Sequence, residues 1–231
     1  MKKTKNNNLL AAIFIFILSF FIFYFGGYIQ LIPIALFNIE YPINNMTTYT
    51  LLNLFSNLII MSALIWIFKK PLKEGLEKLK KAPLKTVDNA FKYYLLGLFG
   101  MMISNFLITF VLKGGGANNE KVVQSMISSA PIFMIISAGI IAPIIEEIVF
   151  RLSMNNLFKK TWTYVLASGL LFGSLHVISS FNSVLDLLYI IPYSSLGFAF
   201  AYMDRKENSV YPSILMHMLH NTVLTIISII I

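Results

Sequence analysis

Three apolar runs of the sequence each hold polar residues at a four-residue spacing. In chain order they are Glu147 and Arg151, with Glu146 just before them; Phe172 and His176; and His217 and Asn221. Residues four apart lie on one face of a helix, so each pair can point at one place. A carboxylate, two imidazoles and a carboxamide suffice for hydrolysis, in which a base activates water and hydrogen-bond donors stabilise the oxyanion.

The two adjacent acids differ in what they can pair with. Glu147 and Arg151 share a helix face and can form an ion pair, whereas Glu146 lies about 100° around the helix, away from that pair. A carboxylate within a membrane segment is costly and therefore indicates function, so we expect Glu146 to face a cavity. The simpler alternative is a helix end with a solvated salt bridge.

The histidines have simpler alternatives as well. The simpler role for His176 is a hydrogen bond to a backbone carbonyl. The simpler role for His217 and Asn221 is a polar contact that holds helices together. His220 lies about 60° around the helix from His217 and is expected to be a bystander.

A zinc site is another use of the same residues. Glu146, His176 and His217 could supply one carboxylate and two imidazoles, with water as the fourth ligand. They come from three separate segments, however, and Asn221 suits an oxyanion donor better than a zinc ligand. We therefore expect Glu146 and His176 to activate water directly, without a cofactor, and zinc is the alternative.

Other protease designs are absent from the sequence. It contains no cysteine, no His-Glu-x-x-His and no Gly-x-Ser-Gly element, which excludes thiolate, zincin-type and rhomboid-type sites. Its aspartates do not form a pair in two helices, because Asp186 and Asp204 bracket a single apolar run.

The elements that carry these residues are membrane spans. The chain of 231 residues is 57% hydrophobic and 12% charged, which is about half the charged fraction of a soluble domain. An apolar run of about 20 residues can cross a bilayer as a helix. We predict an all-α bundle with seven spans, at residues 9–25, 50–68, 93–112, 131–151, 164–178, 187–203 and 212–231.

The segments between the spans are also informative. The basic 69–92 loop is expected to contain an amphipathic helix that carries Leu72, Leu76 and Leu79. Tyr28–Phe37 is apolar but short and holds Pro33, so it is either interfacial or an eighth span. Residues 1–130 carry no motif and residues 131–231 carry all three, and we expect both parts to form one membrane domain.

The basic residues predict the orientation. If the N-terminus is cytoplasmic, 16 of the 18 Lys and Arg residues lie on the cytoplasmic side, and only Lys113 and Lys121 lie outside. An eighth span would remove this charge bias, so the distribution of basic residues favours seven spans. The net charge of +8 then fits anionic lipid headgroups rather than nucleic acid.

The three motifs together resemble those of a known family. Glu146-Glu147-x-x-x-Arg151, Phe172-x-x-x-His176 and His217-x-x-x-Asn221 are similar, in this order, to the motifs of the CAAX protease and bacteriocin-processing (Abi) family. That family includes type II CAAX prenyl endopeptidase, and the resemblance covers roughly residues 131–225. Each motif alone is weak, but the ordered set in separate spans is specific.

The resemblance implies an intramembrane peptidase with a cavity that faces the cytoplasm. It implies that Glu146 activates water with His176 as its partner, and that His217 and Asn221 lie on the oxyanion side. Glu147 and Arg151 then form a structural ion pair beside the site.

We therefore predict an intramembrane endopeptidase of the cell membrane that cleaves a peptide tail or leader entering from the cytoplasmic side. The compact, Lys- and Asn-rich sequence is typical of prokaryotes. It favours processing of a secreted peptide, or self-immunity to one, over a prenylated CAAX substrate. The alternative is a non-enzymatic membrane scaffold that binds a partner membrane protein, although intact motifs favour the enzyme.

The lysine distribution generates a test of topology. Single cysteines placed in the 69–92 loop and in the Gly114–Gly116 turn of this cysteine-free chain should react with a membrane-impermeant thiol reagent from opposite sides. The loop should react only when the cytoplasmic side is accessible, because positively charged segments stay inside. Labelling of both positions from one side would contradict the predicted topology.

Overall fold

The computed structural model describes residues 2–41, 43–112 and 117–231, and every regular element within them is a helix. Seven helical stretches are long and apolar enough to cross a membrane, as predicted. They are Leu9–Leu36, Met46–Ile67, Pro83–Val111, Pro131–Leu157, Thr161–Ile178, Val184–Glu207 and Tyr211–Ile230. The all-α, seven-span fold is thus confirmed.

Some spans are built from several helical pieces. The first consists of α1 (Lys2–Phe25), η1 (Gly26–Gln30) and α2 (Leu31–Leu36), and the second is α3 (Met46–Ile67). The amphipathic α4 (Lys69–Lys81) leads into α5 (Pro83–Val111), and α6 (Asn118–Ser129) precedes the fourth span. The last three spans are α9 (Thr161–Ile178), η5 (Val184–Tyr189) with α10 (Ile190–Glu207), and α11 (Tyr211–Ile230).

The fourth span carries the two acids and is the most irregular. It runs through α7 (Pro131–Ile136), the π-helical turn η2 (Ser137–Ile141), α8 (Ala142–Glu147), a second π-helical turn η3 (Ile148–Leu152) and η4 (Asn155–Leu157). Single π turns of this kind commonly occur at functional sites, because the extra residue re-aims the side chains around it.

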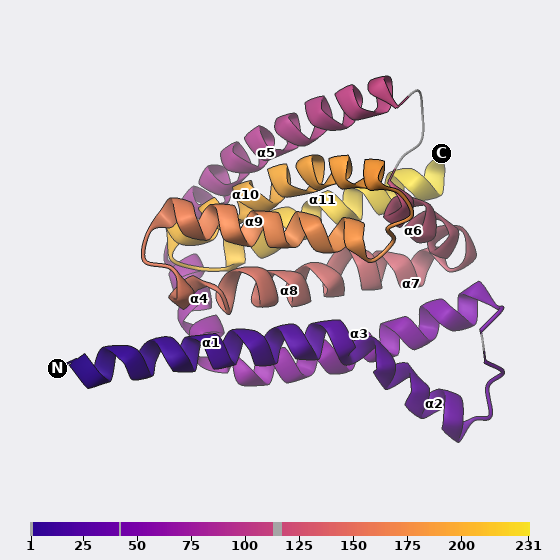
Figure 1. Ribbon diagram of the computed structural model, residues 1–231, viewed down its shortest axis with the longest axis horizontal. Coiled ribbons are helices and arrows are strands. Elements are labelled where there is room, and N and C mark those ends of the chain that lie inside the picture. Colours follow the sequence, from indigo (N-terminus) through magenta and orange to yellow (C-terminus); the bar gives the residue numbers. More distant parts are fainter. Residues whose placement is uncertain (1, 42, 113–116) are drawn as a thin grey trace.

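The helices pack in layers around this span (Figure 1). α1 and α3 lie side by side on one flank of α7–α8, and α9, α10 and α11 lie on the other. α5 packs against α10 at the outside of the bundle. The core between the layers joins α3 to the fourth span and α9, and includes Leu64, Ile145, Ile148, Phe150 and Phe172.

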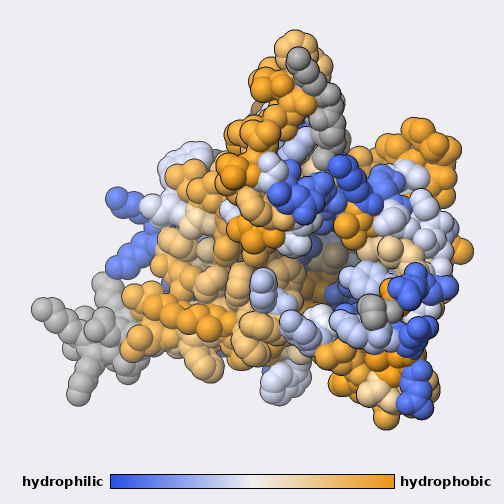
Figure 2. Space-filling model, turned by 45° about the vertical axis from the view of Figure 1, so that its right-hand side comes forward, coloured by the Kyte–Doolittle hydropathy of each residue, from blue (hydrophilic) through white to orange (hydrophobic). Residues whose placement is uncertain are grey.

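The surface is that of a protein surrounded by lipid. Large apolar side chains are exposed along α5, including Leu96, Phe99, Phe106 and Phe110. In Figure 2 a broad hydrophobic band covers the flank of the molecule, and hydrophilic residues gather towards its ends. Such an arrangement would be unfavourable in water, whereas it suits a chain whose flank contacts acyl chains.

Several predicted boundaries were wrong. Tyr28–Phe37 does not add an eighth span, because η1 and α2 follow α1 within one candidate span that ends at Leu36. The third helix begins at Pro83 rather than at Tyr93, so the predicted basic loop is α4 followed by the first turns of α5. Helix α6 was not predicted. The Gly114–Gly116 turn and Lys113 lie outside the described residues.

Close contact between α9 and α10 depends on small residues. A Cβ atom at Gly173 would lie 2.8 Å from both the carbonyl oxygen of Ile190 and the backbone nitrogen of Ser194. Because glycine carries no side chain there, the two backbones can approach as membrane helices with small interface residues do. This approach brings Tyr193 of α10 onto the ring of His176, with 4.9 Å between the ring centroids.

Candidate active site

The first motif contains a fully buried ion pair. Nε of Arg151 lies 3.1 Å from Oε2 of Glu147, and neither side chain is exposed. Nη1 of Arg151 also donates a 2.7 Å hydrogen bond to Oγ of Ser168 on α9, and its guanidinium lies 4.9 Å from the ring centroid of Phe172. Because a lone buried charge is costly, these partners are what allows Arg151 to lie inside the bundle.

Glu147 also orients the first imidazole. Nδ1 of His217 on α11 lies 3.0 Å from Oε1 of Glu147. A carboxylate only accepts hydrogen bonds, so the shared proton belongs to Nδ1, and Nε2 is left to face the interior of the site. That nitrogen lies 3.8 Å from Oε2 of Glu146. Glu147 therefore links Arg151 to His217, a contact that the sequence did not indicate.

The second imidazole approaches from the opposite side. Nδ1 of His176 donates a 2.9 Å hydrogen bond to the backbone carbonyl of Phe172, the contact that the simpler alternative for this residue required. The same bond directs Nε2 toward Glu146, at 3.9 Å from Oε2. A backbone contact and a place at the site are therefore compatible, since each ring nitrogen serves one of them.

Glu146 lies between the two rings. Its side chain is 14% exposed, and its Oε2 atom has no hydrogen-bond partner among the described residues. The two imidazole nitrogens lie 3.8 and 3.9 Å from this oxygen, which is too far for direct hydrogen bonds. One small polar molecule between the carboxylate and the two rings could contact all three groups. The structure thus brings Glu146, His176 and His217 together.

Asn221 is used differently from the expectation. Its Nδ2 atom donates a 3.0 Å hydrogen bond to the carbonyl of Ala138, and the neighbouring Thr222 donates at 3.2 Å to the carbonyl of Gly139. Both carbonyls belong to the π-helical turn η2, whose widened geometry alters the regular helical hydrogen bonding. In this structure Asn221 therefore joins α11 to the turn before α8. Its amide contacts the backbone rather than Glu146 or the two site histidines.

His220 lies outside the group, as expected of a bystander. Its Nδ1 atom is 3.2 Å from the hydroxyl of Tyr94 on α5, and the residue is 8% exposed. The pair satisfies two buried polar side chains and joins α11 to α5.

One face of α9 carries more polar contacts near the site than the Phe172–His176 motif alone indicated. Tyr164, Ser168, Phe172 and His176 follow one another at four-residue spacing and share one face. Tyr164 donates to Oδ2 of Asp204 at 2.5 Å and also lies 3.2 Å from the carbonyl of Arg151. The signal was present in the sequence, because two buried hydroxyls stand one and two turns before the Phe–His pair.

The described residues contain no group of three His, Cys, Asp or Glu side chains arranged to hold a metal ion. Glu146, His176 and His217 are brought together, with both Nε2 atoms facing Glu146. Their Nδ1 atoms contact Glu147 and a carbonyl, as the second ring nitrogen of a histidine does whether the first contacts water or a metal. Zinc stays the alternative, and no step is assigned to a metal.

Comparison with known proteins gives a consistent result. Residues 128–223 match the family described as type II CAAX prenyl endopeptidase Rce1-like. The chain is also 28% identical over 137 residues to "Putative membrane peptidase YdiL" of Bacillus subtilis (strain 168), which covers 58% of this chain and 52% of that protein. It thus spans about half the length of this relative. No solved structure matches the chain significantly.

The motif-bearing region is thus similar to the type II CAAX prenyl endopeptidase family, the resemblance that the three motifs indicated. The seven apolar helices and these comparisons together indicate a multi-pass membrane protein that is similar to membrane proteases.

The buried pair generates a prediction about stability. Glu147→Ala should lower the thermal unfolding midpoint of the purified protein far more than Glu146→Ala does. It leaves both Arg151 and His217 without their carboxylate, and removing one partner of a buried ion pair costs about 3–5 kcal/mol. Glu147→Gln, which keeps the shape but not the charge, should fall between them. Equal losses for the two alanine variants would contradict this assignment.

Proposed function

We propose that the protein is an intramembrane endopeptidase in which Glu146 is the general base. The observation that carries this proposal is the position of Glu146, whose unpartnered Oε2 atom lies within 4 Å of an imidazole nitrogen on each side. An attacking water molecule placed among these three groups would be held and oriented by all of them.

The two imidazoles would have different roles. His176 donates from Nδ1 to a carbonyl, so its neutral ring presents an acceptor at Nε2 that can share the proton of the water with Glu146. In its protonated form, His217 donates from Nε2 and would stabilise the oxyanion, while the Glu147 carboxylate balances its charge.

The reaction follows from these roles. The water oxygen forms a bond to the carbonyl carbon of the scissile peptide as its proton passes to Glu146. The carbonyl oxygen gains negative charge and is stabilised by His217. Collapse of the tetrahedral intermediate breaks the carbon–nitrogen bond, and the proton held by Glu146 passes to the leaving amine.

The family match and the sequence both support one substrate class. The matched family is described by its prenyl endopeptidases, and the Bacillus relative is named as a membrane peptidase. A peptide tail or leader at the surface of the cell membrane fits both, entering from the cytoplasmic side. Processing of a bacteriocin or pheromone, or self-immunity to one, is the role that we propose for this chain. A non-enzymatic scaffold would need none of the Glu146 chemistry.

Substitution of Glu146 tests the proposal. Cells that carry Glu146→Gln should lose a peptide product that wild-type cells release, and cleavage of that peptide by purified protein should fall by about 10²–10⁴-fold. Glu40→Gln, in an exposed loop, is the matched control and should cleave normally. Near wild-type cleavage by Glu146→Gln at normal abundance would end the general-base assignment.

The same preparation tests the zinc alternative. Chelation should leave the activity of the purified protein unchanged. Stoichiometric zinc, with activity lost on its removal and restored on its return, would replace direct water activation by metal chemistry at the same residues.

A further inference from the structure

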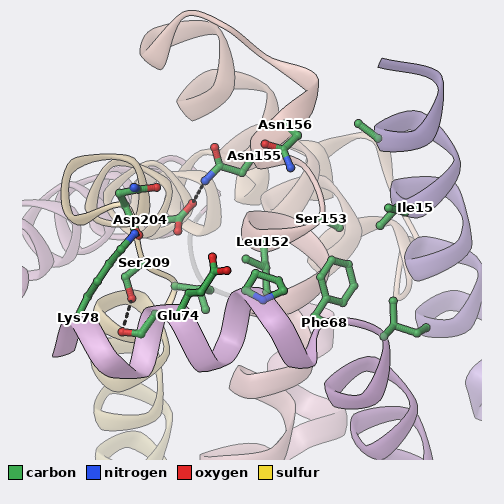
Figure 3. A pocket seen from close by; sticks show the side chains of 16 residues that line it. Ile15, Phe68, Glu74, Lys78, Leu152, Ser153, Asn155, Asn156, Asp204 and Ser209 are labelled. Atoms are coloured by element: carbon green, nitrogen blue, oxygen red, sulfur yellow. Dashed lines mark hydrogen bonds between the residues drawn. The ribbon is translucent and has the colours of Figure 1, made fainter. Parts of the chain in front are cut away.

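A cavity of about 370 Å³ lies at the end of the bundle where α4 meets the turn between α10 and α11. Figure 3 shows its two unlike walls. One is apolar and includes Ile15, Phe68 and Leu152, and the other is polar and includes Glu74 and Asp204. Neither Glu146 nor the two site histidines line it, so this cavity is separate from the candidate active site.

Asp204 is the best-defined polar group of the cavity. The residue is 1% exposed. Its Oδ2 atom accepts hydrogen bonds from Tyr164 at 2.5 Å and from Asn155 at 3.2 Å, whereas Oδ1 has no hydrogen-bond partner among the described residues. Two donors on one oxygen hold the carboxylate in place. A buried acceptor that is fixed but unpartnered and lines a cavity is a group to which a donor can bind.

The cations near Asp204 form no ion pair with it among the described residues. Nη2 of Arg205 donates to the carbonyls of Asn155 and Phe158, at 3.1 and 3.0 Å. Lys78, the one lysine among the lining residues of the cavity, donates at 2.7 Å to the carbonyl of Asn208. No ion pair involves Asp204 or Glu74 among the described residues.

Glu74 adds a second carboxylate. It is an exposed residue of α4, and in Figure 3 its carboxylate points toward Asp204. The polar wall thus carries two acids, one buried and one accessible, next to an apolar surface. That combination favours a guanidinium or ammonium group with an apolar chain attached.

The cavity lies near the candidate active site along the fourth span, and buried side chains stand between the two. A chain of contacts runs from Asp204 to Tyr164, from Tyr164 to the Arg151 carbonyl, and from Arg151 to Glu147. Leu152 lines the cavity and stands six residues after Glu146, roughly 9 Å along the helix. An extended peptide covers this distance with about three residues.

We propose that this cavity binds a basic side chain of the substrate peptide, roughly three residues from the bond that is cleaved. The inference rests on the proposed function for the identity of its ligand. The charge of the basic residue would be held by Asp204 and Glu74, and its methylene chain would lie against the apolar wall.

The test measures binding alone. Full-length protein carrying Glu146→Ala, which should not cleave, is placed in phosphatidylcholine nanodiscs. Two fluorescein-labelled decapeptides of alanine and leucine are titrated by anisotropy, identical except for one central arginine or its uncharged isostere citrulline. The arginine peptide should bind roughly fivefold more tightly, the effect of a modest charge contact.

Substitutions locate the contact. Glu74→Gln, at an exposed position that does not endanger folding, should remove most of the arginine preference. Asp204→Asn should reduce the arginine preference further. Glu77→Gln, on the same helix but away from the cavity, should leave it unchanged.

Three results would overturn the proposal. They are equal binding of the two peptides, a preference that survives Glu74→Gln, and a preference that disappears when phosphatidylethanolamine is added, which would assign the cavity to a lipid amine. Because the measurement requires no cleavage, its failure would leave the proposed function standing. Normal cleavage by Glu146→Gln would end the proposed function without removing the arginine preference.

Discussion

A carboxylate and a guanidinium, both without exposure to solvent, face each other in the middle of this bundle. Neither Glu147 nor Arg151 could remain there alone, since an unpaired charge in a membrane interior is expensive. Their mutual contact dictates where the neighbouring helices can lie. Ser168 of α9 must reach Arg151, and His217 of α11 must reach Glu147. One ion pair therefore sets the relative position of three spans.

This arrangement of helices determines which groups surround Glu146. It is the next residue to Glu147, so the helix turns it to another side, where His217 and His176 converge. The π-helical turns before and after α8 adjust that direction, and Asn221 and Thr222 hold the first of them. The ion pair of Glu147 thus positions the groups that surround Glu146, the candidate general base next to it in the sequence.

Local patterns allowed much of this to be predicted. The number of spans followed from apolar length, and the Glu147–Arg151 contact followed from a spacing of four residues. The contact between Glu147 and His217 could not be predicted, because it depends on how α8 and α11 cross. The start of α5 was missed because Lys85 and Lys92 suggested a loop, although Pro83 begins the helix and Asp88 pairs with Lys92 at 2.6 Å. Helix α6 was missed because it does not span the membrane.

The account stands on Glu146 and His176 acting together on one water molecule, and a double-mutant cycle of single-turnover cleavage rates tests this most directly. Glu146→Gln and His176→Ala should each remove most of the rate, and the double variant should be little slower than either, since groups that act as a unit are strongly non-additive. Losses that multiply in the double variant would show that the two side chains act independently and would contradict the account.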